Sequence, residues 1–194
     1  MKKIALIMLA AGNSRRFGSN KLFYQIGGKC MYEYTLENLT DISQSNPSVY
    51  SVTVVTQYPE IAGKAEAKRS RAIMNHHPEK GISFSIRLGI AANRDADACL
   101  FAVADQPWLT KGTISGLIHQ FLLSGKKIGG VVCREQMGNP CIFDRQYYEE
   151  LERLDGDVGG KKILMMHQED TTLYSVTDEK ELTDMDVKPE SQPG

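Results

Sequence analysis

The stretch IALIMLAAGNSRRFGSNK, residues 4–21, decides the fold because an apolar run passes directly into small and then basic residues. Ile4–Leu9 is short and aliphatic, a pattern typical of a strand that is buried on both faces of a parallel sheet. Met1, Lys2 and Lys3 precede it as in a secretory signal, but no small-residue cleavage site follows. We therefore interpret the run as a buried first strand.

The rest of the chain alternates similar apolar runs with amphipathic stretches. Further strands are expected at Ser51–Thr56, Ala98–Val103 and Lys127–Val132. Helices are expected at Met31–Leu39, Ile82–Ala92, Thr113–Leu123, Tyr147–Leu154 and Lys161–His167. This alternation predicts a three-layer α/β fold with a mostly parallel sheet, formed by one domain over residues 1–194.

The composition predicts neither a nucleic-acid surface nor a membrane span. The chain has 23 basic and 24 acidic residues, whereas proteins that bind a phosphate backbone usually carry a basic excess. No apolar run is long enough to cross a bilayer. The cysteines, Cys30, Cys99, Cys133 and Cys141, form no C-x-x-C motif and no metal-type cluster, which favours a reducing, cytoplasmic location.

The loop that follows the first strand has the composition of an anion-binding site. The small residues 10–12 let a ligand approach the backbone, and exposed N–H groups in such a turn form an anion nest. Arg15, Arg16 and Lys21 would offer three cations to a triphosphate, which carries about four negative charges. The alternative is a turn with solvated basic residues. Neither the Walker pattern nor G-x-G-x-x-G fits this loop.

A carboxylate stands directly after the apolar run at residues 98–103. In the segment Ala-Asp-Gln-Pro that begins at residue 104, the acid is costly unless it is hydrated, paired or bound to metal. Asp105 could instead cap the next helix, but Thr110 lies closer to the helix start and suits that role better. Ligands bind beyond the carboxyl ends of parallel strands, so Asp105 is our candidate ligand for Mg²⁺.

The loop resembles the L-A-A-G-x-S-x-R-x-G-x-x-K signature of the nucleotidyltransferases that modify molybdenum cofactor. The matching positions are Leu9, Ala10, Ala11, Gly12, Ser14, Arg16, Gly18 and Lys21. The resemblance implies a Rossmann-like nucleotidyltransferase fold in which this loop clamps the triphosphate, with Arg16 and Lys21 as phosphate contacts. Asp105 resembles the metal-binding acid of the family's Asp-x-Pro motif. The expected catalytic residues are thus Arg16, Lys21 and Asp105.

Residues 75–89 resemble the family's N-x-x-W-x-x-G-x-S-x-S segment, which contributes to the nucleotide pocket. The further expected nucleotide-binding residues are Asn75, Gly81, Ser83 and Ser85, which keep the register of that segment. Pro78 stands where the family has Trp, so an aromatic contact from this position is not expected. The His-His pair at residues 76–77 invites a metal interpretation, but no further ligand lies nearby, and a solvated loop is favoured.

Three later segments resemble the acceptor side of the family's site and its second metal ligand. Gly138 and Pro140 match a Gly-x-Pro-x-x-Phe motif that shapes the acceptor pocket, although a turn leading into a strand also explains them. Gly156, Asp157 and Lys161 match L-x-G-D-x-G-A-R, with Lys161 in place of the bidentate Arg; a turn with a helix cap is the alternative. Asp186 resembles an acid of the family's terminal D-I-D-x-P-E-D and is the expected second Mg²⁺ ligand, with Asp157 as the alternative.

The resemblance implies transfer of a nucleotidyl group to a phosphorylated acceptor with release of pyrophosphate. Residues 10–12 read Ala-Ala-Gly, which goes with CTP in this branch, whereas Ala-Gly-Gly goes with GTP. The expected partners are therefore CTP (or GTP), a molybdopterin-type acceptor and a molybdenum hydroxylase client. A sugar-phosphate nucleotidyltransferase, a non-catalytic carrier or insertion factor for molybdenum cofactor and an NAD(P)-dependent oxidoreductase are the alternatives.

Overall fold

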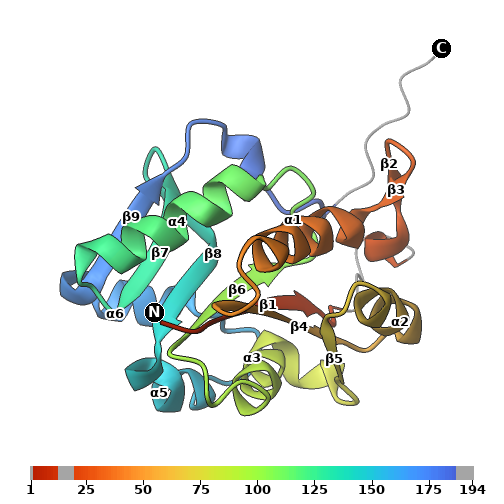
Figure 1. Ribbon diagram of the computed structural model, residues 1–194, viewed down its shortest axis with the longest axis horizontal. Helices are drawn as coiled ribbons and strands as arrows, with labels where there is room; N and C mark the ends of the chain where they lie inside the picture. The colour runs from red at the N-terminus through yellow and green to blue at the C-terminus, as the bar shows by residue number, and fades with distance from the viewer. Residues whose placement is uncertain (1, 13–19, 187–194) are drawn as a thin grey trace.

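One twisted sheet forms the middle of the molecule, and helices cover both of its faces (Figure 1). A computed structural model describes residues 2–12 and 20–186, and within these ranges the sheet has seven strands. In spatial order the strands are β5 (Arg71–Met74), β4 (Tyr50–Thr56), β1 (Ile4–Ala10), β6 (Ala98–Val103), β8 (Gln136–Asp144), β7 (Ile128–Cys133) and β9 (Thr171–Ser175).

Most neighbouring strands run parallel, as predicted. β4 and β6 flank β1 in parallel, β5 extends β4 in parallel, and β9 pairs in parallel with β7. The exception is β8, which runs antiparallel to both β6 and β7. The predicted α/β fold with a mostly parallel sheet is confirmed.

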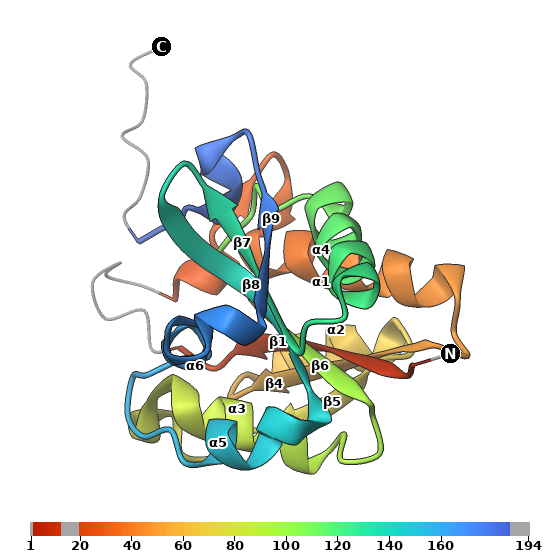
Figure 2. The same cartoon turned by 90° about the vertical axis from the view of Figure 1, so that its left-hand side faces the viewer.

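The helices form the two outer layers (Figure 2). One layer consists of α1 (Met31–Ser45), α2 (Pro59–Ala67) and α4 (Lys111–Ser124), and the other of α3 (Gly81–Ala91), α5 (Tyr148–Glu152) and α6 (Lys161–Met166). Shorter elements are the hairpin β2 (Gln25–Ile26) and β3 (Lys29–Cys30), and the 3-10 turns η1 (Lys21–Phe23), η2 (Pro78–Lys80), η3 (Arg145–Tyr147), η4 (Gln168–Asp170) and η5 (Glu179–Leu182). No helix in the described part of the chain has both the length and the apolar character that crossing a bilayer requires.

Strand β1 is buried because its side chains enter both hydrophobic layers in turn. Ile4, Leu6 and Met8 pack into the cluster beneath α1, α2 and α4, whereas Ala5 and Ile7 pack into the cluster beneath α3, α5 and α6. Successive side chains of a strand point to opposite faces, so an uninterrupted apolar run is what a doubly covered strand requires.

Two βαβ connections meet at β1, and their helices cover opposite faces of the sheet. From β1 the chain passes through α1 to β4, and from β5 it passes through α3 to β6, on the other side of β1. The carboxyl ends of β1 and β6 therefore lie at the switch point of the sheet, where open α/β folds bind ligands. Gly89 lets α3 approach closely, since a Cβ there would lie 2.9 Å from Ile7 Cγ2.

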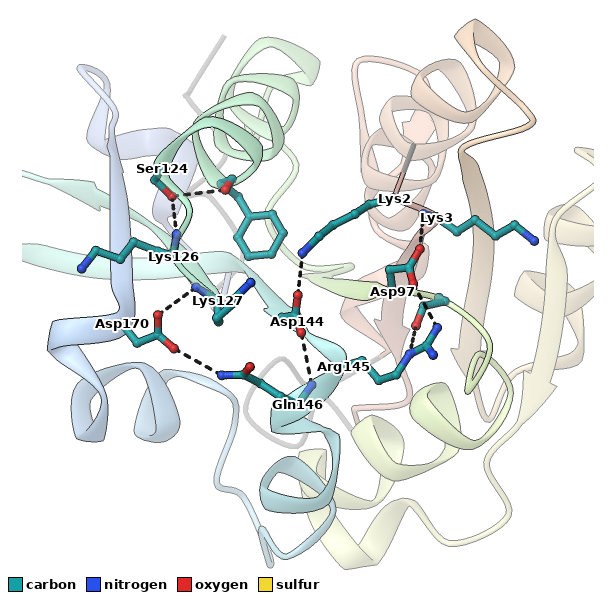
Figure 3. Close-up of polar contacts among 12 residues, drawn as sticks. Lys2, Lys3, Asp97, Ser124, Lys126, Lys127, Asp144, Arg145, Gln146 and Asp170 are labelled. Atoms are coloured by element: carbon teal, nitrogen blue, oxygen red, sulfur yellow. Dashed lines mark hydrogen bonds and ion pairs between the residues drawn. The ribbon is translucent and has the colours of Figure 1, made fainter.

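At the opposite end of the central strands, charged residues contact one another (Figure 3). Lys2 Nζ lies 2.6 Å from Asp144 Oδ2, and Lys3 N donates to Asp97 Oδ2 at 2.8 Å. Arg145 joins Asp97 from the next segment at 3.1 Å. Two ion pairs and one backbone hydrogen bond thus tie the residues before β1 to the start of β6 and the end of β8.

Candidate active site

A cleft of about 350 Å³ opens at the carboxyl ends of β1 and β6. Of the residues predicted from the sequence, those that line it are Leu9, Ala10, Ala11, Gly12, Lys21, Gly81, Ser85, Asp105 and Asp157. The cleft thus brings together residues from five separate stretches of the chain. Ser14 and Arg16 lie outside the described residues, and their expected phosphate contacts stay predictions.

Asp105 is available to the cleft because another residue caps the following helix. Thr110 is the N-cap of α4, and its hydroxyl oxygen accepts a hydrogen bond from Thr113 N at 3.1 Å. Glu181 supports this cap by accepting from both the amide and the hydroxyl of Thr110. The prediction that Thr110 rather than Asp105 caps α4 is confirmed. The Asp105 carboxylate pairs with the Lys21 ammonium instead.

Lys21 is shared by two carboxylates. Its Nζ lies 2.7 Å from Asp105 Oδ2 and 2.8 Å from Asp186 Oδ1, although the residues are 84 and 165 positions away along the chain. The Lys21 side chain is only 12% exposed, so burial by itself lowers its pKa. The charges and hydrogen bonds of Asp105 and Asp186 outweigh burial and raise the pKa of Lys21 above its usual value. The cleft therefore holds a charged ammonium.

The C-terminal segment is fastened against the end of β6. Met185 is buried, and its N donates to Asp105 O at 3.0 Å. Gln106 Nε2 donates to Asp184 Oδ1 at 2.8 Å and to Leu182 O at 3.2 Å. These contacts carry Asp186 to the cleft. The role of Gln106 was not predicted; its only signal in the sequence is a polar residue directly after a candidate ligand.

Two carboxylates that converge on one cation fit a magnesium ion bound together with a phosphorylated ligand. Mg²⁺ takes one or two protein carboxylates and completes its shell with water and phosphate oxygens. Among the described residues, no group of three or more His, Cys, Asp or Glu side chains is arranged to hold a metal by itself. Burial, followed by the charge of Asp105, raises the pKa of Asp184, the acid that lies between the buried Met185 and Gln106.

One wall of the cleft is formed by two glycine backbones in contact. Gly81 has φ +76°, and a Cβ there would lie 2.3 Å from the carbonyl carbon and oxygen of Gly156. Ser83 is fully buried, and its N donates to Gly156 O at 3.2 Å. Asn75 is 1% exposed, and its Nδ2 donates to Ser85 Oγ at 3.0 Å. Ser85 reaches the cleft, whereas Asn75 and Ser83 lie behind its wall.

A second cavity of about 200 Å³ adjoins the cleft and shares Leu9, Ile82 and Asp157 with it. Of the expected acceptor residues, Asp157 and Lys161 line this cavity. The other three line neither cavity: Gly138 and Pro140 lie within β8, and Gly156 lies against Gly81. Their expected acceptor contacts stay predictions. The segment after residue 138 is thus a strand throughout.

Leu22, Glu79 and Ile82, to which no sequence motif pointed, also line the cleft, as does Pro78. Pro78, the position without the family's Trp, begins η2 at the cleft wall. The neighbouring His77 packs edge-on against Phe84 and pairs with Glu79 at 3.1 Å. His77 therefore belongs to a side-chain cluster, and no group of three or more His, Cys, Asp or Glu that could hold a metal is found among the described residues.

A mostly parallel sheet with a switch-point cleft lined by small residues, a lysine and several acids is typical of nucleotide-binding α/β proteins. The family model described as the MobA-like NTP transferase domain matches residues 6–171. The chain belongs to this family, and the family's members are nucleotidyltransferases.

Two curated relatives resemble the chain. A probable molybdenum cofactor guanylyltransferase from Thermococcus gammatolerans is 30% identical over 123 residues, which cover 61% of this chain and 57% of that protein. The chain therefore spans little more than half the length of this relative. The purine catabolism protein PucB from Bacillus subtilis is 25% identical over 191 residues, 95% of this chain and 92% of PucB.

Solved structures share the fold at low sequence identity. A nucleotidyl transferase from Methanothermobacter thermautotroptrophicus superimposes with a TM-score of 0.79 at 19% identity, covering 95% of this chain and 92% of that chain. Rv0371c from Mycobacterium tuberculosis, in its complex with manganese, gives a TM-score of 0.71 at 16% identity, with coverages of 92% and 90%. These likenesses confirm the predicted nucleotidyltransferase fold.

Proposed function

We propose that this nucleotidyltransferase transfers CMP from CTP to the phosphate of a molybdopterin-type acceptor and releases pyrophosphate. The observation that carries the proposal is the meeting of residues 10–12, Lys21 and Asp105 in one cleft. Backbone amides and an ammonium suit a triphosphate, and the adjoining cavity with Lys161 suits a second, phosphorylated substrate.

The proposed chemistry asks the protein for placement and charge neutralisation. The acceptor phosphate oxygen attacks the α-phosphorus of CTP, and the bond to the bridging oxygen breaks as pyrophosphate leaves. Lys21, with Arg16 from the loop, neutralises the charge that develops on the leaving pyrophosphate. Lys161 and Asp157, which line the second cavity, orient the acceptor, and Gly138, Pro140 and Gly156 shape the backbone around it.

Asp105 and Asp186 are the proposed magnesium ligands, since both carboxylates reach the position of one cation. A bound Mg²⁺ would neutralise phosphate charge and keep the reacting groups in line. That a structurally similar protein has been crystallised with manganese supports the use of a divalent cation. Before the ion and the triphosphate bind, Lys21 pairs with both carboxylates and so keeps them in place.

The choice of CTP over GTP rests on the Ala-Ala-Gly sequence of residues 10–12. Ala11 lines the cleft, where its methyl group takes room that a glycine would leave free. Similarity to a probable guanylyltransferase supports GTP instead, so the affinities for CTP and GTP must be compared directly. Tighter binding of GTP than of CTP in the presence of Mg²⁺ would overturn this choice.

The deciding experiment incubates the protein with Mg²⁺, CTP or GTP, and molybdopterin or a hexose 1-phosphate, and measures released pyrophosphate and the nucleotidylated product. We expect pyrophosphate only with CTP and molybdopterin, a loss of at least about a hundredfold in Asp105→Asn, and little change in the surface control Asp41→Asn. Product with the sugar phosphate would identify a sugar-phosphate nucleotidyltransferase. Binding of molybdopterin without pyrophosphate release would identify a carrier, and reduction of a substrate by NAD(P)H would identify an oxidoreductase.

We also propose that the protein acts in the cytoplasm as one catalytic domain and passes its product to a molybdenum hydroxylase. All four cysteines are thiols in the structure, which suits a reducing compartment. Co-purification with a molybdenum hydroxylase, reduced in Lys161→Ala if product loading drives the contact, would test the client.

A further inference from the structure

Three consecutive side chains at the end of β4 hold three consecutive carbonyl groups at the start of the phosphate loop. Thr56 Oγ1 donates to Ala10 O at 3.0 Å. Gln57 Nε2 donates to Ala11 O at 2.8 Å. The Tyr58 hydroxyl donates to Gly12 O at 2.8 Å. The loop thus leaves β1 with each carbonyl pinned to the neighbouring strand.

These hydrogen bonds fix the direction of the amides as well as of the carbonyls. A trans peptide group is planar, and its N–H points away from its C=O. When the carbonyls of Ala10 and Ala11 turn toward the end of β4, the N–H groups of Ala11 and Gly12 turn to the opposite side. Both residues line the cleft. The result is a row of amides aimed at one side, which is the arrangement of an anion nest.

The pinning side chains are themselves held in place. Thr56 is fully buried, and its hydroxyl oxygen accepts from Tyr58 N at 3.1 Å while its hydrogen goes to Ala10 O. The Tyr58 ring packs edge-on against Phe23, with centroids 5.6 Å apart. Phe23 belongs to η1, the turn that also contains Lys21. Tyr58 therefore connects the outgoing side of the loop with the returning side.

We propose that Thr56, Gln57 and Tyr58 are positioning residues that hold the loop amides in the orientation that binds the triphosphate. The inference rests on the proposed function, because it takes a nucleoside triphosphate as the ligand of the loop. Residues at the end of β4, outside the loop signature, would thus contribute to recognition of the triphosphate by holding the loop. Their loss should weaken binding of the triphosphate and leave binding of the monophosphate intact.

The test uses variants that remove one hydroxyl each and keep the packing. Tyr58→Phe keeps the ring against Phe23, and Thr56→Val keeps the shape of the side chain. Thr56→Ser retains the hydroxyl and is the rescue variant, and Tyr50→Phe, at the other end of the same strand, is the matched control. Calorimetric titrations with CTP and with CMP, both with Mg²⁺, give the Kd values, and turnover assays give KM and kcat.

We expect the Kd and KM for CTP to rise about fivefold in Tyr58→Phe and in Thr56→Val, with the Kd for CMP unchanged, because each variant loses the hydrogen bond that holds a loop carbonyl. Thr56→Ser and Tyr50→Phe should match the wild type. If CTP and CMP weaken together, or neither changes, the positioning role is wrong. If the wild type binds GTP rather than CTP, the same comparison is made with GTP and GMP. A wild type that binds no nucleoside triphosphate would overturn the proposed function and this inference together.

Discussion

Replacing Lys21 by methionine removes the one ammonium that Asp105 and Asp186 share and keeps most of the side-chain volume. A hydrogen bond to a charged group contributes about 1.5–3 kcal/mol when it is buried, and an exposed ion pair about 0.2–1 kcal/mol. Asp105 is 21% exposed and Asp186 is 56% exposed, so the first pair counts as largely buried and the second as exposed. We therefore expect the free energy of unfolding to fall by about 2–4 kcal/mol.

The same substitution should make the protein respond to magnesium without nucleotide. In the wild type a divalent ion must displace an ammonium that lies 2.7 Å from Asp105. In Lys21→Met the two carboxylates have lost that ammonium, and ion binding adds to stability by mass action, about 2.7 kcal/mol at a concentration one hundred times its Kd. Excess MgCl₂ should therefore restore most of the lost stability in the variant and change the wild type little.

Urea denaturation of both proteins, with and without MgCl₂, measures these differences. Lys29→Met is the matched control, because Lys29 pairs with Glu37 at 2.6 Å on the surface and away from the cleft. A variant that gains no more from MgCl₂ than the wild type does would refute the reasoning, since Lys21 would then not stand in the place of the ion. A similar magnesium response in Lys29→Met would mean that the effect is not specific to the cleft.

Two further changes test the cleft wall and the start of α1. Gly81→Ala should cost about 2 kcal/mol or more and weaken CTP binding, because the φ of Gly81 is positive and the added Cβ would meet Gly156. The control Gly63→Ala lies in α2 with open space around it and should be neutral or slightly stabilising, since alanine favours a helix more than glycine does. Equal denaturation midpoints for wild type, Gly81→Ala and Gly63→Ala would contradict this prediction. Glu33 accepts from Cys30 N in a capping box, and its hydrogen bond with Lys64 lowers its pKa. The charge of Glu33 thus stabilises the fold above the usual carboxyl pKa and ceases to do so as pH falls through the lowered one. Glu33→Gln should therefore be less stable than wild type near neutral pH and equal to it in acid; a pH-independent difference would be the wrong result.

The elements that could be predicted from the sequence are those whose signal is local. The runs that became β1, β4 and β6 are apolar because they are covered on both faces, and that requirement is visible in a few adjacent residues. Strand β8 is different, because it contains Gly138 and Pro140 and owes its form to pairing with β6 and β7. The alternative interpretation of Gly138 and Pro140, a turn that leads into a strand, is wrong: both residues lie within β8, since tertiary pairing outweighs local propensity.

The candidate site divides in the same way. Asp105 was predictable because the end of an apolar run marks the sheet edge where ligands bind. That Asp186 reaches Lys21 depends on a contact across 165 positions, and on a buried Met185 that no spacing rule indicates. No motif indicates the roles of Gln57 and Tyr58 either. These residues follow β4 and contact the loop from outside its signature. Local chemistry shows which groups are present, and only packing shows which of them meet.

The shared ammonium also bears on the order in which ligands enter. Lys21, Asp105 and Asp186 together carry one net negative charge. A free triphosphate, with about four negative charges, meets a Lys21 ammonium that already pairs with both carboxylates. A free Mg²⁺ must displace that lysine. If Mg²⁺ and the triphosphate bound together, Asp105 and Asp186 would hold the ion and Lys21 would be released to the phosphates, so each ligand would remove the cost that the other faces alone. The geometry therefore favours the metal–nucleotide complex as the species that binds, and the affinity for CTP should rise steeply with Mg²⁺.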